Sequence, residues 1–573
     1  MRIVKLFGLL FFVGLMAFKD PSPKEKLQEL IATYEKQRKY EYDPQASLEN
    51  TIQFYKAEAE FSEKLMKELK KIKVSELLET DQISYELLLF VLQENIDYYK
   101  FKMFLNPITN EYAFHLRLNR IGNKTLKNEK DIKEYFKQLS NLPQKVDYNL
   151  DLLREGVKEG ISQPKAVFYE YDKTYNKHIV KDVTISDFYK PFLNLPEPLS
   201  KERKDSIIKA AKKSVKENAV NQYKKIKKFF EKEYFPNTRK GLGVSTTPNG
   251  KAFYQNRINY YTTSKKYTAQ DIHDIGLKEV ARIRAEMEAI IKELSFEGSF
   301  DDFLKFLRTD EQFYPKTAKE LLMFARDISK RIDAQLPGYF KTLPRKPYGV
   351  EPVPEALAPN YTSGRYSGSY SETTAGYYWV NTYNLPSRTL YTIPALTAHE
   401  AVPGHHLQIS LNNELPKSIP GFRRSLYLSA YGEGWGLYSE TLAGEMGIYT
   451  TPYERFGKLT YEMWRACRLV VDTGVHALGW TRQQMLDYMA ENTALSLHEV
   501  RTETDRYISW PGQALSYKIG ELKIRELRQK AEEELGSKFD IREFHEIILE
   551  EGTVTLAILE NRINNYIEQT KNE

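Results

Sequence analysis

Apolar residues recur at spacings of three and four along most of this 573-residue chain, and this spacing limits its possible folds more than any other feature. It is the spacing of residues on one face of an α-helix. At one expected helix start, Thr268 is followed three residues later by Asp271, a variant of the capping box. The pattern predicts a mainly α protein with helices at residues 47–72, 81–99, 130–157, 201–234, 268–294, 318–335, 394–412, 425–446, 453–476, 481–491, 513–535 and 553–568.

The length of the chain predicts two or more lobes or one large helical domain, because single hydrophobic cores stop growing at roughly 250–300 residues. A hydrophobic content of 41% with 28% charged residues is typical of a folded protein and excludes a disordered one. Proline and glycine accumulate at residues 235–250, which makes this stretch the best candidate for a boundary between two regions of the chain. We therefore expect an N-terminal helical region at 19–245 and a second helical region at 246–573, both lobes of one domain.

Strand signals are few. Asn249 and Gly250 form a hairpin-type turn pair, and an alternating pattern follows through Tyr254 to Tyr261, which predicts β-structure there. Residues 375–384, "AGYYWVNTYN", are a second run rich in β-formers. The sequence thus predicts only a small β-element within a helical protein.

The N-terminus resembles a secretory signal at residues 1–18. Arg2 and Lys5 precede a short apolar run at 6–18, and cleavage is expected near Ala17. An uncleaved membrane anchor is the alternative. No cysteine follows the run, so we expect no lipid attachment, and no later segment is apolar enough to span a bilayer. These features predict an exported protein, periplasmic or extracellular, without stable membrane insertion once the signal is removed.

Charge and cysteine content exclude some classes of function. The formal net charge of +6, from 84 basic and 78 acidic residues, gives no case for nucleic-acid binding at this length. The lysine-rich stretch at 201–234 is interpreted as a helix with a solvated basic face. Cys467 is the only cysteine, which rules out intrachain disulfides and a cysteine-based metal site; we expect it to be a small buried residue.

The stretch "TAHEAVPGHHLQ" at 397–408 contains the candidate chemistry. Zinc hydrolases with an HExxH helix carry two histidines four residues apart on one face, and the glutamate acts on water. Here His399 and Glu400 are adjacent, but the next histidines are His405 and His406. A separation of six turns an ideal helix through about 240° net and rises about 9 Å, which would point the two rings apart.

The residues between the histidines can repair this mismatch. Pro403 removes a helical N–H and Gly404 admits unusual backbone torsions, so a bulge or break there can bring a histidine back towards His399. At this point His405 and His406 both remain candidates for the second ligand.

A third metal ligand is expected from "YGEGWGLYSE". Glu433 and Glu440 lie seven apart on one face of the next predicted helix. Gly432 and Gly434 flank Glu433 and would allow another backbone to approach closely. Glu440 is the fallback ligand, or a partner that orients a ligand histidine.

Four stretches together resemble the DUF885 family of exported bacterial proteins, which are regarded as zinc metallopeptidases. They are "HEAVPGHHLQ", "YGEGWGLYSE", "VDTGVHALGWTRQQ" and "WPGQALSYKIGELKI". The likeness is strong from Thr268 to the C-terminus and weak before it. The family pattern HExxPGH favours His405 over His406. The resemblance implies a large helical gluzincin-like fold around a central cleft, with one zinc ion (Zn2+) bound by His399, His405 and Glu433 and with Glu400 as general base.

The same resemblance suggests further roles. His476, Tyr507 and Tyr517 are the candidates for stabilising the oxyanion, and Arg506 could hold a substrate carboxylate. The run at 377–384, which includes Tyr378, would be an edge strand that binds a peptide by strand addition. Each has a structural alternative: a buried and satisfied histidine, packing tyrosines or a salt-bridged arginine.

The sequence as a whole predicts an exported zinc-dependent metallopeptidase that hydrolyses short peptides through a zinc-activated water. A helical protein that binds peptides without cutting them is the first alternative. A metal-dependent amidase acting on cell-wall or small-molecule amides is the second.

Overall fold

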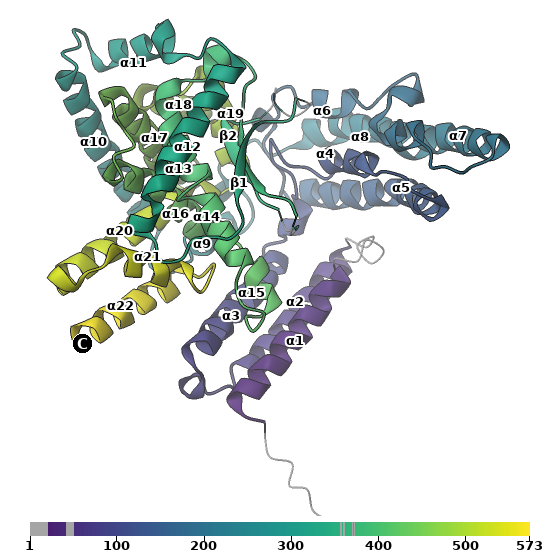
Figure 1. Cartoon of the computed structure of the whole chain (residues 1–573). Coiled ribbons are helices and arrows are strands. Elements are labelled where there is room, and N and C mark those ends of the chain that lie inside the picture. Colours follow the sequence, from purple (N-terminus) through teal and green to yellow (C-terminus); the bar gives the residue numbers. More distant parts are fainter. Residues whose placement is uncertain are drawn as a thin grey trace, which may run out of the picture.

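The computed structural model is mainly α-helical, as the sequence predicts, and has a hairpin bundle, an arm and a body (Figure 1). It describes residues 21–41, 51–355, 358, 361–369, 371 and 373–572. The predicted signal at 1–18 lies outside these residues. The predicted division between 245 and 246 stays a prediction.

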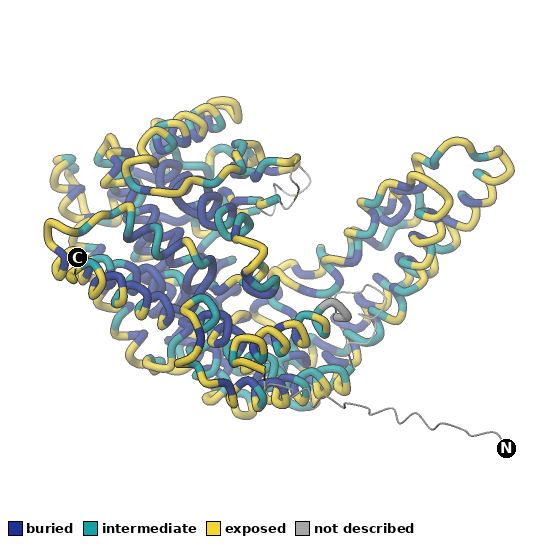
Figure 2. Tube along the Cα trace, turned by 60° about the horizontal axis from the view of Figure 1, so that its bottom comes forward, coloured by how far each residue is buried: buried dark blue, intermediate teal, exposed yellow. Residues whose placement is uncertain are grey.

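The N-terminal helices form the hairpin bundle and the arm. The bundle consists of α1 (Pro23–Glu41), α2 (Ile52–Leu69) and α3 (Glu79–Lys100). The arm consists of α4 (His115–Leu118), α5 (Glu129–Lys158), α6 (Lys173–Asn176), α7 (Lys201–Val215) and α8 (Asn221–Phe229), with π-helical turns after α7 and α8. Figure 2 shows the arm projecting away from the body.

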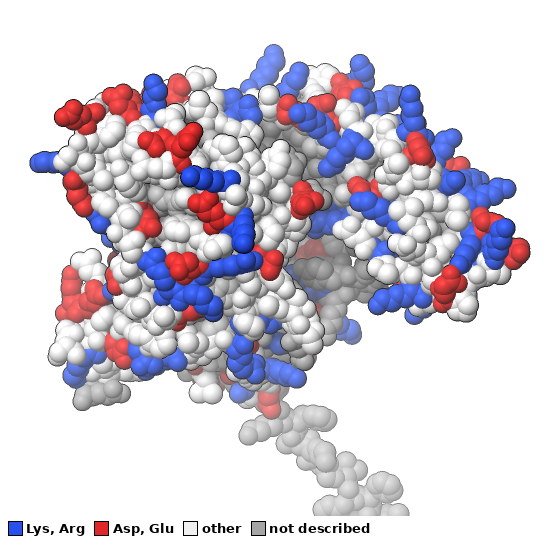
Figure 3. Space-filling model, turned by 45° about the horizontal axis from the view of Figure 1, so that its top comes forward, with Lys and Arg blue, Asp and Glu red and all other residues white. Residues whose placement is uncertain are grey.

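The body contains the remaining helices and one small sheet. Its helices are α9 (Gly250–Tyr261), α10 (Ala269–Glu293), α11 (Phe300–Thr309), α12 (Ala318–Tyr339), α13 (Ile393–Glu400), α14 (His405–Asn413), α15 (Gly421–Ser425), α16 (Ser429–Glu445), α17 (Pro452–His476), α18 (Arg482–Asn492), α19 (Leu497–Ser509), α20 (Ser516–Leu535), α21 (Ile541–Leu549) and α22 (Leu556–Asn572). In the space-filling view the surface is hollowed between body and arm (Figure 3).

Two large hydrophobic clusters hold the three parts together. One contains Phe229 of the arm and Val470 of α17 in the body, both almost completely buried. The other contains Leu88 of α3, Trp435 of α16 and Ile563 of α22. Burial of such side chains contributes about 1.5–3 kcal/mol each. The candidate metal-binding helices therefore sit on a scaffold to which both ends of the chain contribute.

The sheet lies against the helices of the predicted site. Its strands are β1 (Tyr348–Pro352), β2 (Gly364–Ser367) and β3 (Gly376–Val380), in the order β1-β3-β2. β3 runs parallel to β1 and antiparallel to β2, with Tyr366 opposite Tyr378. The predicted β-run at 375–384 is thus a strand, but it is the central strand, with both edges paired. The prediction of an edge strand there is wrong, and β2 is the edge strand beside α13.

The β-structure predicted around Asn249 and Gly250 is also wrong, because residues 250–261 form helix α9. Asn249 adopts the left-handed conformation and precedes the helix. The buried residues of α9 include Tyr254, Arg257 and Ile258, which have helical spacing. Tyrosines favour strands only where cross-strand neighbours can pack on them, and here packing on the body decides for a helix.

Several predicted helices are confirmed with shifted ends. The capping box of Thr268 and Asp271 is present at the start of α10. The predicted helix at 394–412 is broken into α13 and α14, and the one at 425–446 begins only at Ser429. The predicted solvated basic face is present, because exposed lysines lie opposite a buried apolar face on α7 and α8. Cys467 is buried, as predicted. Within the described ranges, no helix combines the length and the apolar character needed to cross a membrane.

Candidate metal centre

The centre is built on the break between α13 and α14. Residues 401–404 leave the helical path, and the N–H of Gly404 reaches back to the carbonyl of Ala398 at 3.0 Å. A Cβ on Gly404 would lie 1.9 Å from the carbonyl oxygen of His399, so only glycine fits this approach. The indole of Trp435 donates to the carbonyl of Pro403 at 2.9 Å and fixes the break to α16.

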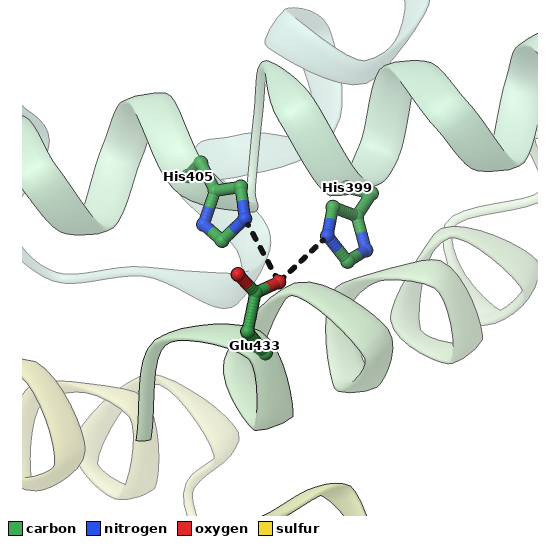
Figure 4. A group of neighbouring side chains, drawn as sticks. All are labelled: His399, His405 and Glu433. Atoms are coloured by element: carbon green, nitrogen blue, oxygen red, sulfur yellow. Dashed lines mark ion pairs between the residues drawn. The ribbon is translucent and has the colours of Figure 1, made fainter. Parts of the chain in front are cut away.

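The break brings His399 and His405 together although six residues separate them. His399 lies in the last turn of α13, and His405 is the first residue of α14. Their ring centroids are 4.8 Å apart and the ring planes are perpendicular. Figure 4 shows both Nε2 atoms pointing at the carboxylate of Glu433 on α16; its Oε2 lies 3.5 Å from His399 and 3.4 Å from His405.

These distances suit a shared metal ion. Tetrahedral zinc with bonds of about 2.0–2.1 Å keeps its protein ligands about 3.3 Å apart. The three ligand atoms all lie within 4.8 Å of one another, and within the part of the chain that is described no other group of histidine, cysteine, aspartate or glutamate side chains has this arrangement. Two imidazoles and a carboxylate are a donor set that zinc favours.

The pKa values of His399 and Glu433 are each shifted by the other members of the cluster. Burial by itself would lower the pKa of His399, but Glu433 and Glu440 outweigh it and raise that pKa to about 9. The two histidines in turn hold the pKa of the buried Glu433 carboxyl well below its ordinary value, against the effect of burial. The carboxylate is thus ionised and ready to bind a cation.

Glu440 orients one of these histidines. It is completely buried and follows Glu433 on the same helix, α16. Its Oε1 lies 2.8 Å from Nδ1 of His399. Arg465 of α17 approaches the same oxygen at 3.3 Å. A carboxylate on Nδ1 fixes the ring and leaves Nε2 for a metal. Of the two alternatives in the sequence, Glu433 lies in the cluster and Glu440 lies behind it.

His406 is directed elsewhere. Its Nδ1 lies 3.0 Å from the hydroxyl of Tyr366 on β2, and its ring packs against Tyr348 on β1. Burial lowers its pKa to about 4. The neighbouring histidine, His405, is the one that faces Glu433, in agreement with the HExxPGH pattern.

Glycines let α16 approach its neighbours. A Cβ on Gly436 would lie 2.7 Å from Cε1 of His399, so this glycine makes room for the ring. A Cβ on Gly434 would lie 2.6 Å from the backbone of Gly520, so α16 and α20 pack backbone to backbone. The close approach predicted from the glycines around Glu433 is therefore present.

Glu400 is held beside the cluster by the edge strand. It is the last residue of α13, and its Oε2 accepts a hydrogen bond of 2.8 Å from the backbone N–H of Tyr366. Helix and strand together fix the position of the carboxylate next to His399.

The other predicted catalytic residues differ in their surroundings. Both nitrogens of His476 are paired with backbone groups, the N–H of Val244 and the carbonyl of Tyr507, and burial lowers its pKa to about 3. The Tyr507 hydroxyl is enclosed by Trp464, Arg468 and Glu503. Both side chains are already fully used by internal contacts.

Tyr517 is half-buried, and its pKa is raised by burial and then by Glu433, so it lies within electrostatic reach of the cluster.

The predicted substrate-binding residues, Arg506 and Tyr378, are paired with other side chains or buried. The Arg506 guanidinium pairs with Glu503 at 2.9 Å and donates to Gln513 at 2.6 Å. Tyr378 lies on the central strand β3 and is completely buried. Of these three residues, Tyr517 is the one whose pKa responds to Glu433.

Tyr427 is a site residue that the sequence analysis did not find. Its hydroxyl donates to Oε1 of Glu433 at 3.0 Å, so it holds the oxygen that the histidines do not face. The residue is 45% exposed, and desolvation of its hydroxyl, followed by the charge of Glu433, raises its pKa well above the ordinary value. Residue 427 lies between two helices, where no periodic signal marks it.

Comparisons with known proteins place the chain in a family and show solved structures with the same fold. The chain matches the family described as "Bacterial protein of unknown function (DUF885)" over residues 40–563, and it therefore belongs to that family. No curated protein matches it. The crystal structure of a "putative lipoprotein" from Colwellia psychrerythraea is similar, with a TM-score of 0.84, 26% identity and coverage of 96% of this chain and 100% of that one.

A second solved structure, a "putative lipoprotein of unknown function" from Shewanella oneidensis, has a TM-score of 0.70 at 18% identity. It covers 94% of this chain and 99% of that one. At this identity the likeness shows a shared fold.

Proposed function

We propose that this member of the DUF885 family is an exported zinc-dependent peptidase that hydrolyses short peptides. The observation that carries the proposal is the approach of two imidazole nitrogens to one carboxylate oxygen, at 3.5 and 3.4 Å, across a helix break that requires glycine. A buried Glu440 behind His399 supports it, since ligand histidines almost always have such a partner.

His399, His405 and Glu433 would hold the ion. When bound, zinc supplies a Lewis acid that polarises the scissile carbonyl and makes a water nucleophilic at neutral pH. Tyr427 keeps Oε1 of Glu433 engaged, so that the carboxylate offers Oε2 to the ion. Glu440 keeps His399 in the tautomer whose Nε2 is free.

Glu400 would carry the proton. Tyr366 holds its Oε2, which leaves Oε1 to accept a proton from the attacking water and then deliver it to the leaving amine. Tyr517 remains the candidate donor to the developing oxyanion, because it lies within electrostatic reach of Glu433, whereas the hydroxyl of Tyr507 and the nitrogens of His476 are held by groups outside the cluster.

The substrate and the location are proposed from the family resemblance, the N-terminal sequence and a structural relative. A closed cleft, which the resemblance to zinc peptidases implies, favours short flexible peptides over folded proteins. Export is supported by the signal-like N-terminus and by the 26% identical solved structure, which is described as a lipoprotein.

Metal analysis and peptide cleavage test the proposal together. Purified protein is expected to contain one zinc per chain and to cut members of a peptide library. Glu400→Gln should keep the metal and lose on the order of 10²–10⁴-fold in rate. Glu445→Gln, at the end of α16 and paired with Arg528, is the control carboxylate and should retain activity.

Three outcomes would overturn the proposal: no stoichiometric metal, no cleaved peptide, or a Glu400→Gln variant as active as wild type. Zinc binding with cleavage of peptidoglycan-fragment amides alone would identify an amidase instead. Peptide binding without any cleavage would identify a non-catalytic binding protein.

A further inference from the structure

The arm carries an excess of positive charge that the rest of the chain does not share. Residues 115–229 contain 26 basic and 15 acidic side chains, a net charge of +11. The whole chain has 84 and 78, so the other residues contain 58 and 63 and carry −5. In Figure 3, blue side chains gather over the arm. This separation of charge favours an anionic partner for the arm in particular.

Part of this charge forms a continuous surface on α7, which lies at the outer end of the arm (Figure 1), and on α8. We call it the basic face, and its six exposed lysines are Lys209, Lys212, Lys213, Lys216, Lys224 and Lys228. The first four recur at three and four residues, the spacing of one helix face. The turn Lys216–Val220 is π-helical and contains about one extra residue, which keeps the last two lysines in line with the others.

The six lysines of the basic face form no ion pair with any residue that the structure describes. Lysines next to them do: Lys204 pairs with Glu197 and Lys225 with Asp147. The opposite side of α7 is buried in the arm through apolar residues such as Ile207. The charge of the basic face is therefore available to an external anionic partner.

Two exposed apolar side chains accompany these lysines. Ile185 is 70% exposed and Leu193 is 62% exposed. They belong to the short 3₁₀ helices Val183–Ile185 and Asp187–Leu193, and both of these segments contact α7. Large aliphatic side chains beside unpaired cations are typical of surfaces that lie on a membrane.

An electrostatic contact places one of these segments next to the basic face. Asp182, directly before Val183, accepts hydrogen bonds of 2.9 and 2.8 Å from Thr184. These bonds, and then the charge of Lys212, lower the pKa of the Asp182 carboxyl. Ile185 and the basic face are therefore neighbours on the surface of the arm.

The combination favours a lipid bilayer over a soluble polyanion. Sulfate, phosphate and carboxylate groups of a polymer would use the lysines alone and gain nothing from exposed Ile185 and Leu193. A bilayer with anionic lipids uses both kinds of side chain: ammonium groups lie among the head groups, and aliphatic groups enter the boundary with the acyl chains.

We propose that the basic face, together with Ile185 and Leu193, is a docking surface for a bilayer that contains anionic phospholipids. The arm then lies on the bilayer without crossing it. This inference goes beyond the proposed function and does not depend on it, because no residue of the docking surface belongs to the candidate metal centre.

Vesicle co-sedimentation tests the role of charge. The full chain is used throughout, so that its N-terminal apolar run contributes equally to every variant. With about one-third phosphatidylglycerol in phosphatidylcholine, wild type should bind at least about tenfold more tightly than to phosphatidylcholine alone. The combined variant Lys209→Glu, Lys212→Glu, Lys213→Glu, Lys216→Glu should lose about 100-fold or more in affinity, since each lysine near an anionic surface contributes about fivefold.

A matched control changes the same amount of charge on the body. Lys278→Glu, Lys292→Glu, Lys319→Glu and Lys417→Glu, combined, replace four exposed lysines outside the arm. This variant should bind anionic vesicles within about threefold of wild type, because charges distant from the bilayer are screened. Circular dichroism confirms that both variants are folded.

A second pair of variants tests the apolar contribution. Ile185→Ser with Leu193→Ser keeps all charges and should weaken binding to anionic vesicles about tenfold, with binding to soluble dextran sulfate unchanged. Leu78→Ser with Leu497→Ser, both 70% exposed outside the arm, is the control and should bind like wild type.

Three results would overturn the proposal: equal affinity of wild type for neutral and anionic vesicles, an equal loss in the two lysine variants, or wild-type affinity for anionic vesicles in Ile185→Ser with Leu193→Ser. The last result, combined with a loss of dextran sulfate binding in the arm lysine variant, would identify a surface for soluble polyanions instead.

Discussion

The arm and the body both bury histidines, and His399 in the body behaves in the opposite way to His115 and His178 in the arm. In the arm, His115 contacts the hydroxyl of Thr174, and burial lowers its pKa to about 3. His178 has Asp187 only at 3.7 Å, and burial lowers its pKa to about 4. In the body, His399 is as deeply buried, but its pKa rises to about 9.

The difference lies in the carboxylates that accompany each ring. His399 has Glu433 on one nitrogen and Glu440 on the other. His115 has aromatic neighbours instead, such as Tyr171 and Phe230, and His178 packs against Tyr223 with a single carboxylate at a longer distance. A buried imidazole without a carboxylate stays neutral and packs like an aromatic ring. Burial alone therefore does not distinguish the proposed metal ligand His399 from the histidines of the arm, whereas its two carboxylates do.

The largest expected effect separates His405 from His406. His405→Gln should lower zinc affinity more than about 100-fold, beyond the 10–100-fold that supporting residues contribute. His406→Gln, the adjacent and equally buried control, should change it less than about tenfold, because its Nδ1 faces Tyr366. Zinc competition against a chromophoric chelator measures both. A larger loss in His406→Gln would mean that the ligand assignment is wrong.

The helix break is the next test. Gly404→Ala places a Cβ 1.9 Å from the carbonyl of His399, so α13 and α14 must shift apart. We expect the free energy of unfolding to drop by roughly 3 kcal/mol, with weaker zinc binding. Gly338→Ala, where the added methyl meets nothing within 4 Å, is the control and should stay within about 1 kcal/mol of wild type. Urea titration measures both. Equal stabilities would show that the break tolerates a side chain.

Removing one carboxylate should make His399 resemble its counterparts in the arm. Glu440→Gln leaves the shape but removes the charge at Nδ1, and zinc affinity should fall about 10–100-fold while the ion still binds. Glu445→Gln on the same helix is the control, because its carboxylate pairs with Arg528. Calorimetric zinc titration gives the ratio. An unchanged affinity in Glu440→Gln would remove Glu440 from the site.

The smallest effect concerns the arm. His115 has a pKa of about 3 when folded and about 6.5 when unfolded, so below pH 6.5 the unfolded chain takes up a proton that the folded chain refuses. Stability is therefore lost as the pH falls. Relative to His115→Leu, wild type should lose about 2 kcal/mol between pH 6.5 and 5.0. Unfolding in urea at both values tests this, and a pH-independent difference between the two proteins would contradict it.

The helical class and the core of the candidate site could be predicted from the sequence because both depend on local spacing. Apolar periodicity marks long helices such as α10 and α17, and the pair His399–Glu400 with Pro403 and Gly404 marks a break. The glycines around Glu433 indicated that another backbone approaches it, and α20 does so. The periodicity and the break depend on neighbours in the sequence, whereas the glycines indicated a close approach without identifying α20 as the partner.

Long-range packing decided the rest. It made residues 250–261 a helix and put β3 at the centre of its sheet, although their sequences read as a hairpin and an edge. It enclosed Arg506 with Glu503 and brought Tyr427 to Glu433. Periodicity reports which face of an element is buried, but not which partner covers it. The sequence by itself therefore determined a helical protein with a broken histidine helix, and the tertiary structure decided which side chains remain free to act.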